Sequence, residues 1–280
     1  MRTDTLFHKP AKLLAVGSLL FAALVASQPA AAQTTIVGSK HDLTAGGAGP
    51  IKTTDAGTEI CAFCHTPHGS SSVAPLWNKV LPLTTAFTSR YSSSTMDGIT
   101  GVVGPNSLTC LSCHDGVSAM DTMINQPGSG NYNAAGARPG YTWAGGVGVS
   151  GAMLGRTATT YVATIGVDLS DDHPIGIPYC GGFLTGACKD ADFNVNKLYL
   201  NGVVSALAPG TAATDQWWVD TSATPGTRDK SDLVLYADAG GLPTVQCASC
   251  HEPHGASAGI ATFLRIPNTS SALCLTCHKK

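Results

Sequence analysis

The chain has 280 residues, of which 12% are charged and 6% are aromatic, and its formal net charge at pH 7 is −2. This balance leaves no strongly basic surface, so the composition argues against a nucleic-acid-binding protein. A chain of this length has few aromatic side chains with which to fill its core. Bound groups are therefore expected to provide part of the apolar volume of the core.

The N-terminal segment has the composition of a secretory signal peptide. Basic residues precede an apolar run at 13–26, and three alanines at 30–32 form a cleavage site, so we predict a signal peptide over 1–32. The apolar run is shorter than the roughly 20 residues that span a bilayer, and no second run of that length follows. The mature chain is expected to be exported to the periplasm, the cell surface or the extracellular space, without a membrane span.

A C-x-x-C-H motif occurs four times. It is the attachment motif of c-type haem: two thiols bond to the macrocycle and the histidine ligates the iron. A zinc knuckle or a redox dithiol can also use a C-x-x-C pair, but neither requires a histidine directly after every pair. We therefore predict four covalently bound haem c groups. The attachment residues are Cys61, Cys64, Cys110, Cys113, Cys247, Cys250, Cys274 and Cys277, and the proximal ligands are His65, His114, His251 and His278.

The four motifs form two similar pairs. Residues 64–69 read C-H-T-P-H-G and residues 250–255 read C-H-E-P-H-G, and each is followed by a plain C-x-x-C-H. A duplicated two-haem module explains this agreement better than four independent motifs. We expect an N-terminal module at 33–120, a Gly-rich haem-free insert at 121–240 and a C-terminal module at 241–280.

The insert and the linkers predict a mostly irregular fold. Residues 126–155 are rich in Gly and Asn, which favours loop or extended chain over helix. β-branched or alternating residues at 161–169, 197–204 and 232–236 indicate short strands. We expect mainly coil organised around the haems, with short helices beside the motifs and a small β-element.

Two pairs of side chains in the insert need an interpretation of their own. Cys180 and Cys188 are left after eight cysteines are assigned to haem, and in an oxidising compartment such a pair predicts a disulfide. A redox-active pair is the alternative. Trp217 and Trp218 are interpreted as packing residues, although paired tryptophans also suit a protein contact.

The second axial position of each iron is predicted from a count of histidines. After residue 32, four histidines remain once the proximal ligands are set aside. Their number equals the number of irons, so two histidine ligands are expected at every iron. Some of these histidines could instead lie on the surface, with methionine as the ligand. Imidazole on both sides implies lower potentials than methionine ligation. The candidate distal ligands are His41, His68, His173 and His254, and the alternative methionines are Met96, Met120, Met123 and Met153.

His65 and His68 are only three residues apart in the sequence, so they are not expected to ligate the same iron. Pro67 fixes its own φ and keeps Thr66 away from the α region, so this span cannot pass around the edge of a macrocycle. His68 is therefore predicted to ligate a different haem from His65. By the same argument His254 serves a different haem from the proximal histidine of its own motif.

The C-H-T-P-H-G and C-H-E-P-H-G units resemble the doubled motifs of multihaem cytochromes c from bacteria that respire on external acceptors. Segments 39–43 and 171–176 resemble distal-ligand segments of that family. The chain is similar to the tetrahaem members that polymerise into extracellular filaments, which implies that one histidine of each subunit, here His41 or His68, completes a haem in its neighbour. A head-to-tail contact that does not close into a ring generates such a filament.

The resemblance implies electron transfer to and from other redox proteins rather than catalysis. A soluble periplasmic electron shuttle is the first alternative. A multihaem reductase of a small oxyanion is the second, but it needs an iron with an open axial position and nearby acid or base groups. The histidine count leaves no such iron, and no motif has lysine in place of its proximal histidine.

Overall fold

The computed structural model describes residues 35–71, 76–155, 163–184, 187–200, 203–206, 216–221, 227–255 and 262–279. The chain divides into two units, 1–32 and 33–280, and the description concerns the second. The predicted signal peptide lies outside the described residues. Within them, no helix has the length and apolarity that a membrane crossing requires.

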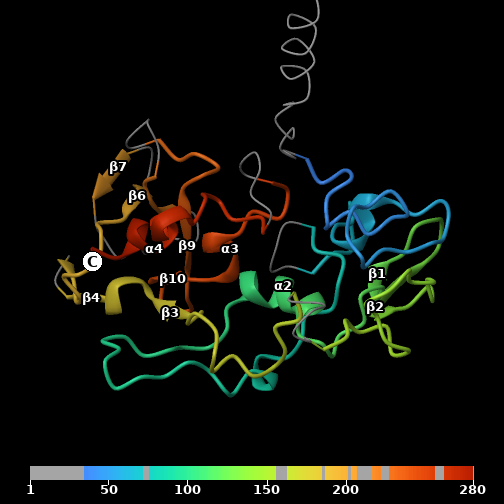
Figure 1. Ribbon diagram of the computed structural model, residues 1–280, viewed down its shortest axis with the longest axis horizontal. Coiled ribbons are helices and arrows are strands. Elements are labelled where there is room, and N and C mark those ends of the chain that lie inside the picture. Colours follow the sequence, from blue (N-terminus) through green and yellow to red (C-terminus); the bar gives the residue numbers. More distant parts are fainter. Residues whose placement is uncertain are drawn as a thin grey trace, which may run out of the picture. The chain divides into compact units, whose positions relative to one another are not determined.

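Most of the described chain is irregular, with short helices at the four motifs (Figure 1). The helices are η1 (Ile60–Phe63), η2 (Thr84–Ala86), α2 (Pro105–His114), η3 (Tyr179–Gly181), α3 (Cys247–Cys250), η4 (Thr269–Ser271) and α4 (Ala272–Cys277). The strands are β1 (Met123–Asn125), β2 (Tyr132–Ala137), β3 (Ile177–Pro178), β4 (Phe183–Leu184), β5 (Ala187–Cys188), β6 (Lys197–Leu200), β7 (Val203–Ala206), β8 (Gln216–Val219), β9 (Leu233–Ala237) and β10 (Pro243–Val245). The predicted class, irregular chain with short helices and small sheets, is confirmed.

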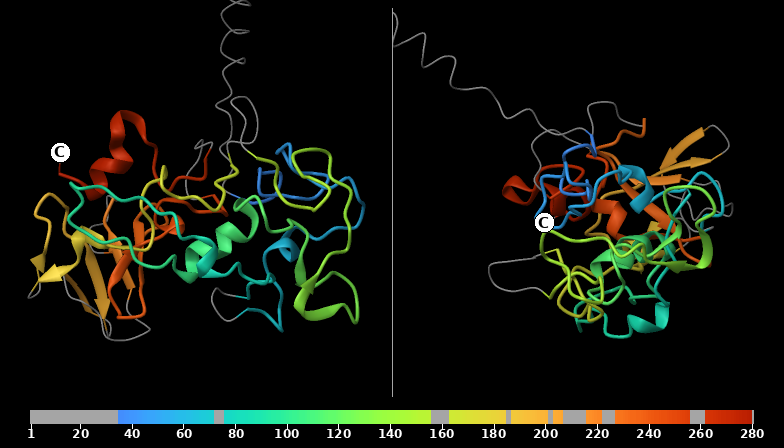
Figure 2. Two further views of the ribbon diagram at one scale, coloured as in Figure 1. Left: turned by 90° about the horizontal axis from the view of Figure 1, so that it is seen from below. Right: turned by 90° about the vertical axis from the view of Figure 1, so that its right-hand side faces the viewer.

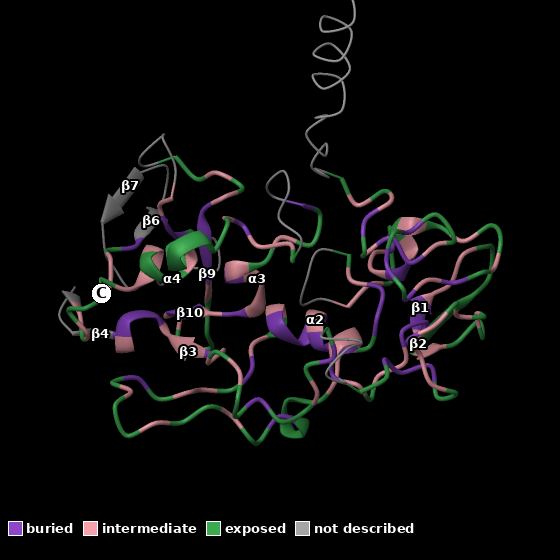
Figure 3. Ribbon diagram, viewed as in Figure 1, coloured by how far each residue is buried: buried purple, intermediate pink, exposed green. Residues whose placement is uncertain are grey.

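Helix α2 lies between the β1–β2 pair and the larger sheet, as the views in Figure 2 show. It begins with Pro105 in its first turn, where the missing backbone N–H costs nothing. Its buried face includes Leu108 and Leu111, which pack with Phe87 and Leu169. Helix α4, by contrast, has no buried residue, and Figure 3 shows this difference in burial between α2 and α4.

The main sheet is larger than the sequence predicted. Six antiparallel strands run in the order β3-β10-β9-β8-β6-β7. Trp217 and Trp218 are each 1% exposed, which confirms their interpretation as packing residues. Trp217, Leu233 and Tyr179 belong to one core cluster, against which Cys277 packs. The core of the sheet therefore reaches the fourth motif, and β10 leads directly into the third.

Two of the three strand predictions hold and one is wrong over its described part. Residues 232–236 correspond to β9, and 197–204 to the antiparallel pair β6 and β7, with Asn-Gly between them in the sequence. Residues 163–169 form no strand. Gly166 has a positive φ of 93°, and the Asp168 carboxylate accepts a hydrogen bond from the backbone N–H of Ser170, so a turn replaces the extended chain.

Cys180 and Cys188 form the predicted disulfide, with their Cα atoms 5.4 Å apart. Replacing both by serine is expected to lower the free energy of unfolding by roughly 2–3 kcal/mol, since the bridge closes a loop over a sequence separation of 8. Chemical denaturation with and without reductant measures this. Reductant should lower the unfolding midpoint of the native protein but not that of the double serine variant. A double serine variant with the same midpoint as the native, oxidised protein would contradict the expectation.

Candidate haem sites

Each motif occupies one helical turn, which brings its two cysteines to the same side. The backbone N–H of His65 donates to the Cys61 carbonyl at 2.7 Å, and the same bond closes the third motif (His251 to Cys247, 3.1 Å) and the fourth (His278 to Cys274, 2.9 Å). The second motif forms the last turn of α2. The local sequence therefore gives all four motifs a similar backbone.

The motif cysteines are free thiols, and burial raises the pKa of several of them. None of the eight is in a disulfide. Burial and the neighbouring Cys113 raise the pKa of the Cys64 thiol to about 12, and burial also raises the pKa of Cys250 to about 11 and that of Cys277 to about 12. Because the thiolate is the reactive form, these three thiols are not activated as nucleophiles, whereas the hydrogen bond with Cys110 lowers the pKa of Cys247.

Successive motifs are neighbours in space, in the order of the sequence. Cys64 and Cys113 pack against one apolar cluster, which joins the first motif to the second. Cys110 hydrogen-bonds Cys247, and Cys250 lies near enough to Cys277 to add to the rise in its pKa that burial mainly causes. Helix α2 is further bound to α3 because Ser107 Oγ accepts the N–H of Cys247 at 3.0 Å. The four motifs thus form a continuous row.

The imidazoles are oriented for metal binding through Nε2. In most of the predicted ligands, Nδ1 lies within hydrogen-bond distance of an oxygen that can only accept, so Nδ1 carries the proton and Nε2 keeps its lone pair. The acceptor is a backbone carbonyl in four cases and a carboxylate in one. The pairs are His41 with Pro253 O (3.3 Å), His114 with Ala163 O (2.7 Å), His173 with Pro174 O (3.0 Å), His251 with Thr262 O (2.9 Å) and His254 with Glu252 Oε1 (2.9 Å).

Two pairs of imidazoles have the spacing of ligands on opposite sides of one metal ion. The ring centres of His65 and His254 are 5.9 Å apart, and those of His41 and His114 are 6.2 Å apart. Metal–nitrogen bonds of about 2.0–2.1 Å on both sides would separate two ring centres by roughly 6 Å. The side-chain positions therefore fit an iron bound between two histidines in each pair.

Further features fit the same group. Burial, followed by the charge of His114, lowers the pKa of His41 to about 4, so the ring stays neutral and able to ligate. His41 also stacks on Phe263 with ring centres 4.2 Å apart. Beside the first motif, the buried Nε1 of Trp77 has no hydrogen-bond partner among the described residues, and its ring centre lies 5.7 Å from that of His65. A bound group with carboxylate acceptors could satisfy this donor.

The remaining predicted ligands are placed differently. His68 is exposed, and His173 lies just before β3, which pairs with the strand that leads into the third motif. Among the described residues, no ring contact places either histidine beside a proximal imidazole. Of the alternative methionines, Met120 and Met153 pack in the apolar cluster around Phe63 and Met123 is fully buried, whereas Met96 is half-buried.

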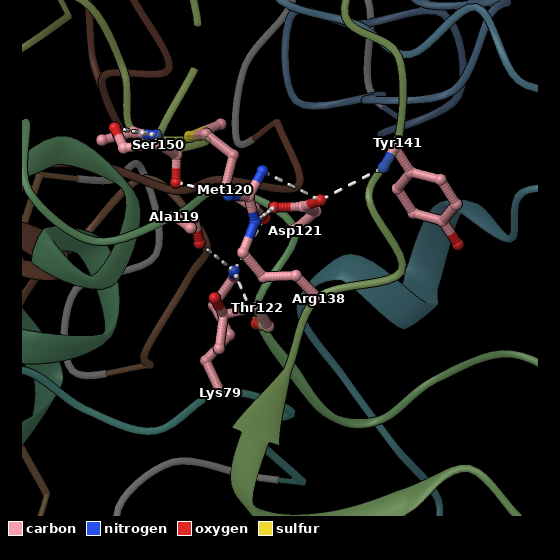
Figure 4. A network of polar contacts seen from close by, with 9 residues as sticks. Lys79, Ala119, Met120, Asp121, Thr122, Arg138, Tyr141 and Ser150 are labelled. Carbon is pink, nitrogen blue, oxygen red and sulfur yellow. Dashed lines mark hydrogen bonds and ion pairs between the residues drawn. The ribbon is translucent and has the colours of Figure 1, made fainter. Parts of the chain in front are cut away.

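A buried polar connection beside the first motif was missed by sequence reasoning. Asn78 is fully buried, and its side chain bonds both the carbonyl of Ala62 and the backbone of Asn125. The neighbouring Lys79 is 1% exposed and donates to the carbonyls of Ala119, Met120 and Thr122 (Figure 4). These two residues bind the first motif to the segment after the second. Nothing in the local sequence distinguishes them, since lysine is seldom fully buried.

Comparison with known proteins adds an independent observation about the last two motifs. Residues 242–280 match a family model described as a doubled CXXCH motif. This match indicates covalently bound c-type haem and a multihaem cytochrome of the electron-transfer class. A comparison with curated proteins finds no match.

Proposed function

We propose that this chain is an exported tetrahaem c-type cytochrome that relays electrons towards an extracellular acceptor, as one subunit of a head-to-tail filament. The observation that supports this most strongly is the spacing of the two imidazole pairs, 5.9 Å and 6.2 Å, each with one histidine from a C-x-x-C-H motif. Both pairs join residues that are far apart in the sequence.

The proposed chemistry is electron transfer without catalysis. Each haem supplies a one-electron iron couple when it is bound. The motif cysteines would hold the macrocycle, and two paired histidines would ligate one iron in each of the two pairs, which would leave those irons no coordination site for a substrate. Such ligation favours a relay over an oxyanion reductase.

The row of motifs supports a relay through the chain. Each motif lies near the next in sequence order: Cys64 and Cys113 pack against one cluster, Cys110 hydrogen-bonds Cys247, and Cys250 is near the fourth motif. The first cysteine of the first motif and that of the last, Cys61 and Cys274, are exposed, while the other motif cysteines are half-buried. The two ends of the row are thus the most accessible places for electrons to enter and leave.

The histidine positions also favour one ligand for contact between subunits. The sequence left His41 and His68 as equal candidates, but His41 lies against His114 of its own chain. His68 is exposed, and within the described residues its ring has no hydrogen bond or ring contact. We infer that His68 completes a haem of the neighbouring subunit.

Replacing His68 by alanine tests the filament directly. The variant is expected to yield single particles instead of filaments in electron microscopy, and one iron per chain should become high-spin. Free imidazole should remove the high-spin signal without restoring filaments. It replaces the missing iron ligand, but it does not connect one subunit to the next. Filaments in H68A would contradict the assignment of His68, and monodisperse native protein would favour the soluble shuttle.

A further inference from the structure

The two-haem modules differ at the residue between the proximal histidine and the proline. Thr66 occupies this position in the first module and Glu252 in the second. The Thr66 hydroxyl donates to the backbone carbonyl of His68, so it leaves the imidazole untouched. Glu252 Oε1 instead lies 2.9 Å from Nδ1 of His254 and 3.1 Å from the backbone nitrogen of the same residue.

The Glu252 carboxylate is firmly held. Its Oε2 lies 3.7 Å from the guanidinium of Arg265, which is 4% exposed. Arg265 is itself fixed, because it donates to the carbonyls of Ala248 (3.0 Å) and Lys230 (2.8 Å). A glutamate that accepts a hydrogen bond and lies beside a guanidinium is ionised at neutral pH, well above the ordinary pKa of its carboxyl group.

This acceptor differs in kind from those of four other predicted ligands. His41, His114, His173 and His251 have a backbone carbonyl at Nδ1, whereas His254 has an ionised carboxylate. A hydrogen bond to an ionised acceptor is stronger and draws the Nδ1 proton away from the ring. It also raises the basicity of a ligating imidazole.

We propose that Glu252, acting through His254, lowers the reduction potential of the iron shared by His65 and His254 below the value that a neutral acceptor at Nδ1 would give. A more basic ligand stabilises the oxidised metal, so this iron gives up its electron more readily. Arg265 neutralises the net charge of Glu252, so the effect is exerted through the hydrogen bond rather than through a long-range field. This inference rests on the proposed bis-histidine ligation and adds to it a residue that sets the potential of one iron.

The experiment is a potentiometric titration of the native holoprotein, E252Q and E252T at constant pH 7, followed by visible absorbance. Glutamine keeps an acceptor without the charge, and threonine reproduces the first module. In both variants one wave, that of the iron shared by His65 and His254, is expected to rise by about a tenfold change in equilibrium constant, 59 mV for a one-electron couple, while the others stay in place. E59Q is the matched control, because Glu59 is the only other glutamate, is exposed and precedes the first motif.

Two results would overturn the proposal. A shift in E252Q no larger than that in E59Q would show that the hydrogen bond does not set the potential. A high-spin iron in E252Q would show that the carboxylate only holds the ring in place. Carbon monoxide uptake by the native protein is measured first. Uptake would show that the proposed bis-histidine ligation is wrong, which is a separate failure from a wrong role for Glu252.

Discussion

Replacing His254 by alanine is expected to open one axial position in the haem-loaded protein. The ring centre of His254 lies 5.9 Å from that of His65, the spacing of two ligands on one iron, and the alanine variant removes one of them. One iron per chain should become high-spin and bind about one equivalent of carbon monoxide. H41A should do the same at the iron of His114, and the double variant should bind about two equivalents.

Controls separate ligation from folding in this experiment. Free imidazole should restore the low-spin spectrum of H254A, which a misfolded protein would not allow. Met153 packs in the apolar cluster around Phe63, and M153L preserves its volume, so this variant should stay low-spin. Carbon monoxide binding by M153L, or its absence in H254A, would mean that methionine rather than His254 supplies the ligand.

Replacing Asn78 by alanine is expected to destabilise the holoprotein by roughly 3–5 kcal/mol. The variant removes the amide that donates to Ala62 O at 2.6 Å and Asn125 O at 2.8 Å and accepts the backbone N–H of Asn125 at 2.8 Å. Each buried group left unpaired costs about 1–3 kcal/mol. The midpoint of thermal or denaturant unfolding, followed by circular dichroism, measures the loss.

Asn131 supplies a matched control for this substitution. It is exposed, and its side chain makes one hydrogen bond, to Pro127 O at 2.9 Å, so N131A should change stability by less than about 0.5 kcal/mol. Equal midpoints for N78A and the native protein would contradict the role of Asn78. K79M should also be destabilised, since the carbonyls of Ala119, Met120 and Thr122 would lose their shared donor.

Features encoded by residues close in sequence could be predicted. The motif turns, the Cys180–Cys188 disulfide and strand β9 depend on chemistry within a few residues, and each is found. The six-stranded sheet was underestimated because its strands pair residues that are distant in sequence, and β3 has only two residues. The expected strand at 161–169 is replaced over its described part by a turn that Gly166 and Asp168 favour.

The sequence indicates which residues belong to the candidate sites but not which of them lie together in space. The spacing of His65 and His68 predicted that they serve different irons, but no local pattern could pair His65 with His254 or His41 with His114. Such pairs depend on how the whole chain folds. The role of Glu252 was accessible in principle, since it is the one difference between the two C-H-x-P-H-G units.

Carbon monoxide titration of the purified, assembled native protein tests the central claim most directly. If every iron has an imidazole on each face, the reduced protein should show no uptake under mild conditions and its spectrum should stay low-spin. Ready binding by even one iron per chain would reveal an open coordination site. The protein would then be better explained as a reductase than as an electron relay.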